Sequence, residues 1–180
     1  MATATPIIAF ESKYGTTRRY AEALAARVGG TAEECKSIDD SAFADPARPL
    51  IVLSPCYASK YAGVKFIKDR AKKSLLDGRR VAAVSVGMTL VEEAREQDIL
   101  SEQLEGIPAE ITTFYVPGRL NYSELSFIDR NVMKMMISML KKKAEPSLNE
   151  QAMIESYGSD NNLYNEAELD AIVEWLSTNQ

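Results

Sequence analysis

The feature that most constrains the fold is a short, uninterrupted apolar run between two prolines. Residues 49–55 read Pro-Leu-Ile-Val-Leu-Ser-Pro. A run this short and this apolar is typical of a strand that is buried on both faces, as in the middle of a parallel sheet. It therefore predicts an α/β architecture in which helices cover both faces of the sheet.

Four further strand-like segments alternate with helical patterns along the chain. The sequence predicts strands at residues 6–10, 31–35, 80–86 and 110–116, and helices over residues 20–28, 62–74, 92–104 and 166–176. This alternation predicts a doubly wound, five-stranded parallel sheet with right-handed crossovers. With 180 residues, 46% of them hydrophobic, the chain is expected to form a single domain over residues 1–180.

One stretch exceeds this minimal unit. We call residues 117–165 the insertion, because they precede the last predicted helix. Residues 124–143 predict an apolar helix that is rich in Met and carries several Lys and Arg, and a polar connector follows it. Two interpretations stay open: the helix packs against the domain, its terminal cations matching the helix dipole, or it docks on a partner protein or a peripheral membrane surface.

Composition narrows the chemistry further. The chain has no histidine, which excludes imidazole as an acid–base group or metal ligand, and no metal site is expected. A net charge of −5 without a clustered basic face argues against nucleic acid as a partner.

Cys35 and Cys56 are spaced unlike a metal or redox pair, so we expect free thiols. No signal peptide pattern and no membrane-length apolar run occur, and a cytoplasmic location is expected.

Ligands of doubly wound sheets bind beyond the carboxyl ends of the strands, so the segments that follow the strands are the candidates. The first loop consists of Ser12, Lys13, Tyr14, Gly15, Thr16 and Thr17. Its hydroxyls and the start of a helix favour a phosphate, although Thr16 or Thr17 would serve equally as an ordinary helix cap. The loop lacks the Gly-x-x-x-x-Gly-Lys spacing of a Walker P-loop.

Two more loops are expected at the same edge. The second loop, after the central strand, contains Ser54, Pro55, Cys56, Tyr57, Ala58 and Ser59, and the third loop contains Gly87, Met88 and Thr89. Without a histidine to activate it, Cys56 is expected to be a packed thiol rather than a nucleophile. Met88 is expected either to cover a ligand or to be a plain loop residue.

The first and second loops resemble those of flavodoxins. The order strand, Ser-Pro-x-Tyr, helix is similar to the flavodoxin segment that lies against the isoalloxazine ring of FMN. The resemblance implies an FMN cofactor, with Tyr57 beside the ring and the backbone of Ala58 or Ser59 near the flavin N5. It further implies an electron-transfer protein with a redox partner whose identity the sequence leaves open.

Two alternatives remain beside the FMN electron carrier. The late insertion, with Asp129-Arg130 leading into a Met-rich basic helix within residues 118–136, resembles oxygen-independent protoporphyrinogen oxidases and implies a flavoenzyme of that type. A phospho-ligand or regulatory module without flavin is the other. It is less well supported, because a receiver domain needs aspartates where this chain has Ser12, Ser54 and Gly87.

Overall fold

The computed structural model describes residues 4–57, 60–97 and 99–178, and its centre is a parallel sheet. The strand order is β2-β1-β3-β5-β6, which confirms the predicted doubly wound α/β fold. The strands are β1 (Ile7–Phe10), β2 (Ala32–Glu34), β3 (Leu50–Tyr57), β5 (Val81–Gly87) and β6 (Ile111–Pro117). A short strand, β4 (Lys60–Tyr61), pairs antiparallel with the end of β3.

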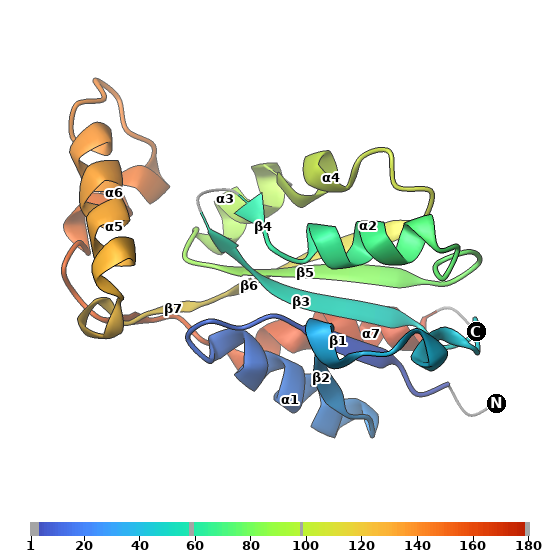
Figure 1. Ribbon diagram of the computed structural model, residues 1–180. Coiled ribbons are helices and arrows are strands. Elements are labelled where there is room, and N and C mark those ends of the chain that lie inside the picture. The colour runs from blue at the N-terminus through green and yellow to red at the C-terminus, as the bar shows by residue number, and fades with distance from the viewer. Residues whose placement is uncertain (1–3, 58–59, 98, 179–180) are drawn as a thin grey trace.

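Helices cover both faces of this sheet (Figure 1). One face carries α1 (Thr16–Val28) and α7 (Asp170–Ser177), and the other carries α2 (Val64–Lys72), α3 (Val91–Gln97) and α4 (Ile99–Leu104). Alternate residues of β3 serve the two layers: Leu50 and Val52 lie in the core beneath α2, whereas Ile51 and Leu53 lie in the core beneath α1. Burial on both faces explains why β3 is an uninterrupted apolar run.

The insertion leaves the sheet after β6 and returns to it before α7. It contains β7 (Arg119–Leu120), α5 (Phe127–Leu140), α6 (Leu148–Glu155) and β8 (Asn161–Asn162), and β7 pairs antiparallel with β8. Figure 1 shows α5 and α6 together beyond one edge of the sheet. The buried Tyr20 hydroxyl fastens both ends, because it donates to Pro117 O at 2.7 Å and accepts from Asn165 N at 2.9 Å.

Several predicted boundaries differ from the structure. The helix predicted over residues 124–143 begins only at Phe127, because Ser126 caps it by accepting a hydrogen bond from Asp129 N, and it ends at Leu140. The polar connector contains a helix, α6, whose start is a Ser147–Glu150 capping box. The helix predicted over residues 92–104 is two helices, and Asp98 between them lies outside the described residues.

Short 3-10 helices lie at Cys35–Ser37, Asp40–Phe43, Tyr122–Glu124 and Glu166–Leu169. Among the helices of the described ranges, none is both long enough and apolar enough to cross a membrane.

Candidate functional site

The three candidate segments meet at one edge of the sheet. Strands β1, β3 and β5 are neighbours and run parallel, so their carboxyl ends lie side by side. Just beyond β1, Glu11 N donates a hydrogen bond to Leu53 O of β3 at 3.0 Å. The fold therefore brings the predicted segments together where doubly wound sheets bind their ligands.

The first loop ends in a helix start that no side chain caps. Gly15 has a φ of 88°, a left-handed conformation that glycine adopts without strain, and its N–H donates to Ser12 Oγ at 3.1 Å. Thr16 and Thr17 make no capping hydrogen bond, and the first turn of α1 has no acidic residue. Beyond the Gly15 N–H, the helix start thus combines a partial positive charge with N–H groups that no side chain caps, which is the chemistry that binds phosphate.

Two side chains of the first loop reach the insertion instead. Lys13 Nζ lies 2.5 Å from Asp129 Oδ2, and the Tyr14 hydroxyl donates to the same oxygen. Ser126 Oγ also donates to it, at 2.8 Å. These hydrogen bonds, from Lys13 first and then from Tyr14 and Ser126, lower the pKa of Asp129 to about 2. Asp129 therefore remains a carboxylate that ties α5 to the first loop.

The second loop needs a correction, because Ser54, Pro55, Cys56 and Tyr57 are the end of β3 rather than a loop. Pairing with β5 continues through Ser54 and Pro55. The backbone groups of odd-numbered residues in β3 point towards β1, as the hydrogen bond to Leu53 O shows. Because β1 has already ended at Phe10, β1 offers no partner for a backbone N–H at position 55, and a proline, which has no N–H, fits there. Tyr57 pairs antiparallel with Lys60 of β4.

Some predicted contacts of the second loop stay predictions. Ala58 and Ser59 lie outside the described residues, as does the side chain of Tyr57. Gly63 is the N-cap residue of α2 and lies against the Tyr61 ring, which a Cβ at Gly63 would approach to 2.7 Å. The lack of a side chain at Gly63 therefore leaves room for the Tyr61 ring.

Two small polar groups lie on the end of β3. Ser54 is fully buried, and its Oγ has no hydrogen-bond partner among the described residues. Cys56 is a half-buried free thiol, and burial raises its pKa, so it stays protonated. A protonated thiol matches the packed role expected for Cys56, whereas the buried hydroxyl lacks the partner that such groups normally have.

The third loop is supported by an aromatic residue that the sequence analysis did not single out. The Tyr115 ring of β6 lies against Gly87, where a Cβ would come within 3.2 Å of it, and its hydroxyl donates to Thr89 O at 2.6 Å. Burial raises the pKa of Tyr115, which keeps this donor protonated. Met88 is half-buried in the same loop. The position of Tyr115, two residues before the end of a strand, was the available signal.

The insertion also contacts the third loop. Leu90 N donates to Asn149 Oδ1 at 3.1 Å, and Glu93 of α3 accepts from Ser147 Oγ at 3.2 Å and from Asn149 N at 3.3 Å. The start of α6 is therefore held near the third loop, while the start of α5 is held at the first loop. The insertion bridges the two loops at the carboxyl edge.

Comparison with known families supplies the classification. Residues 7–147, more than three quarters of the chain, match the family model of the flavodoxin domain. The chain belongs to the flavodoxin family. Membership indicates a flavin cofactor, and it confirms the family resemblance seen in the first and second loops. The match is to the family as a whole and gives no specific evidence for the protoporphyrinogen oxidase group.

Solved structures and curated sequences add less. The chain is similar to the WrbA-like flavodoxin of Agrobacterium tumefaciens, with 16% identity, 70% of this chain and 87% of that chain covered, and a TM-score of 0.43. It is also similar to oxidised flavodoxin 1 of Bacillus cereus, with 18% identity, 63% and 84% covered, and a TM-score of 0.41. At such values structural likeness assigns no function. A comparison with curated protein sequences gave no significant match.

The residues of this flavodoxin-family site fit a phosphate-bearing flavin. An uncapped helix start without acidic residues suits the phosphate, and the orphaned Ser54 hydroxyl suits a polar ligand atom. Glu11, directly after β1, adds a partly buried carboxyl group. Burial raises its pKa, and the charge of Lys65 offsets part of that rise. No cluster of three His, Cys, Asp or Glu side chains that could hold a metal occurs within the described ranges.

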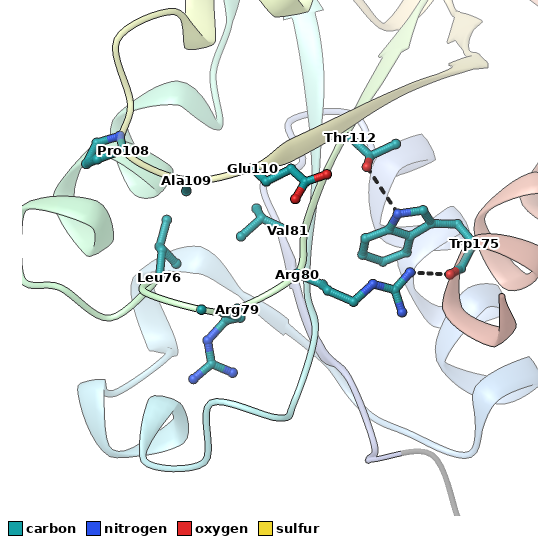
Figure 2. A pocket seen from close by; sticks show the side chains of 10 residues that line it. Leu76, Arg79, Arg80, Val81, Pro108, Ala109, Glu110, Thr112 and Trp175 are labelled. Carbon is teal, nitrogen blue, oxygen red and sulfur yellow. Dashed lines mark hydrogen bonds between the residues drawn. The ribbon is translucent and has the colours of Figure 1, made fainter. Parts of the chain in front are cut away.

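A separate hollow of about 490 Å³ lies at the opposite, amino edge of β5 and β6. Figure 2 shows Arg80 and Trp175 side by side there. The Arg80 guanidinium donates to Trp175 O and lies 4.2 Å from the centre of the indole ring, while Trp175 Nε1 donates to Thr112 Oγ1 at 3.1 Å. The guanidinium of Arg80 and the indole N–H of Trp175 are already paired within the protein, and none of the predicted site residues lines this hollow.

Proposed function

We propose that this protein binds one FMN at the carboxyl edge of β1, β3 and β5 and uses it to pass electrons to or from a partner protein. The observation that carries the proposal is the first loop: in a flavodoxin-family chain, the start of α1 has no side-chain cap and no acidic residue in its first turn. We keep the expected cytoplasmic location as part of the proposal.

The chain's own groups divide the work between the two ends of the ligand. The N–H groups at the start of α1 and the hydroxyls of Ser12, Thr16 and Thr17 would hold the phosphate. The end of β3 with Tyr57, and the third loop with Gly87, Met88 and Thr89, would hold the ring and exclude water from it. FMN, when bound, supplies the capacity to accept and release electrons.

The first test is the visible absorption spectrum of the full chain purified from a flavin-supplied host, with identification of the chromophore released on denaturation. The proposal predicts flavin bands and the release of FMN. A colourless protein that also fails to quench the fluorescence of added FMN would overturn it, and would favour a phospho-ligand module without flavin.

A flavoenzyme of the protoporphyrinogen oxidase type is the second candidate. It is favoured by the bridge that the insertion forms between the first and third loops, because that bridge sets α5 and α6 beside the edge where a substrate would meet the flavin. Oxidation of protoporphyrinogen by the FMN-loaded protein, measured without oxygen and with an added electron acceptor, separates the two candidates. Turnover supports the enzyme, and reduction of a partner without turnover supports the carrier.

A further inference from the structure

Helix α5 exposes an apolar strip along one side. Ile128, Val132, Met135 and Met139 are 72%, 47%, 62% and 67% exposed. Their spacing of four, three and four residues places them on one helical face, about 16 Å long. Phe127, the most exposed apolar residue of α5, lies at the start of the same helix. Single exposed apolar residues are ordinary, whereas a continuous strip marks a contact surface.

This strip is not needed to hold α5 in place. The helix packs against α6, and its buried residue is Ile137, only 2% exposed. Met133, Met136 and Leu140 are half-buried. Asp129, on the same side as Met136 and Leu140, holds the first loop. The attachment of α5 therefore uses other residues, and the strip is left for something outside the chain.

Positive charge gathers on the same segment. Residues 119–143 contain six Lys or Arg and two Asp or Glu, a net charge of +4 in a chain whose total is −5. Lys134, Lys141 and Lys142 are exposed and form no ion pair within the part of the chain that the structure describes. A helix is about 10 Å across, close to the Debye length at ordinary ionic strength. The exposed lysines of α5 and its end would therefore be felt by an anionic surface that touches the strip.

We propose that α5 docks this protein on an anionic lipid bilayer, with the strip of Ile128, Val132, Met135 and Met139 in the headgroup region. An apolar strip together with cations is the combination that binds helices in the plane of such membranes. A second copy of the chain would cover the apolar strip but would bring a net negative charge, and an uncharged surface would leave the cations unused. The docking does not depend on the cofactor, so it holds whether or not FMN binds.

The test is sedimentation of the full chain with vesicles of equal parts phosphatidylglycerol and phosphatidylcholine, compared with vesicles of phosphatidylcholine alone. We expect binding to the anionic vesicles only, and weaker binding as salt is raised. Equal binding to both kinds of vesicle, or no binding together with a concentration-dependent dimer in solution, would overturn the proposal.

Matched variants locate the contact. Met135→Gln with Met139→Gln should weaken binding by at least about tenfold, whereas Met135→Leu with Met139→Leu should leave it nearly unchanged, and all these residues have similar helix propensity. Unchanged melting temperatures would show that the fold is intact. Equal binding of the Gln and Leu variants would place the contact elsewhere and overturn the proposal.

The charge is tested in the same way. Each lysine near an anionic surface contributes about fivefold in affinity, so Lys141→Gln with Lys142→Gln should weaken binding by roughly 25-fold at low salt. The control is Lys68→Gln with Lys72→Gln, two exposed lysines of α2. If the α2 pair loses as much binding as the α5 pair, attraction is spread over the molecule and docking through α5 is wrong.

Discussion

The sheet together with α1, α2, α3, α4 and α7, which we call the sheet unit, and the insertion are held in place by different kinds of interaction. In the sheet unit, β3 buries apolar residues on both faces beneath helices. Within residues 121–160 the buried apolar side chains are Leu125 and Ile137, and much of α5 is exposed. Figure 1 shows the corresponding arrangement, with α5 and α6 beyond the edge of the layered unit.

Polar contacts do most of the positioning of the insertion. Asp129 binds the first loop, Asn149 binds Leu90 of the third loop, and the Tyr20 hydroxyl holds both ends of the insertion. The stabilisation from apolar burial is lost only when packing is lost, whereas the stabilisation from an ion pair also changes with pH and with removal of either charge. The insertion should therefore loosen under conditions that leave the sheet intact.

The largest contrast is expected from two isoleucines. Ile51→Ala in β3 should cost about 4 kcal/mol of unfolding free energy, because the cavity lies between packed layers. Ile137→Ala in α5 should cost about 2 kcal/mol or less, since its surroundings can collapse, and should expose the insertion to protease. Urea unfolding followed by circular dichroism measures both. A larger loss for Ile137→Ala would reverse the comparison.

A smaller effect is expected where the two regions are joined. Tyr20→Phe leaves Pro117 O and Asn165 N without their buried partner and should cost about 1–3 kcal/mol. Tyr122→Phe is the matched change inside the insertion, where the hydroxyl donates to the Tyr157 hydroxyl at 3.1 Å, and it should cost less than about 0.5 kcal/mol. Faster hydrogen exchange at the Asn165 amide in Tyr20→Phe alone would show that the attachment of the insertion has opened. Equal effects of the two variants would contradict the special role of Tyr20 at that attachment.

The sequence predicts the two regions unequally for the same physical reason. Periodicity reveals apolar burial, so the strand order and the segments at the carboxyl edge could be predicted from residues such as 49–55. The contact of Lys13 with Asp129 spans 116 residues and leaves no periodic trace. The continuation of β3 to Tyr57 was missed because it depends on pairing with β4, which a single segment does not reveal. The residues assigned to FMN remain predictions.

The smallest predicted effect concerns pH. Folding lowers the pKa of Asp129 from 3.8 to about 2, mainly through Lys13, so its contact stabilises the folded protein above about pH 4 and is lost as the pH falls towards 2. A carboxyl carbon titration by NMR should show the low pKa directly. Lys13→Gln should raise it towards its ordinary value, while Arg18→Gln, which removes the pair with Glu34, should not change it. An ordinary pKa for Asp129 in the wild type would remove this attachment.

The central claim is that the start of α1 holds the phosphate of FMN, and a carboxylate placed there tests it most directly. Thr16→Glu adds negative charge to the first turn of α1, which favours the helix but repels a phosphate. Titration of the flavin-free protein, followed by fluorescence quenching, should show FMN binding weakened by roughly 100-fold, with riboflavin binding nearly unchanged. Thr16→Gln, the neutral control, should bind FMN almost as the wild type does. If Thr16→Glu binds FMN as tightly as Thr16→Gln, or if the wild type binds no FMN, the account is contradicted.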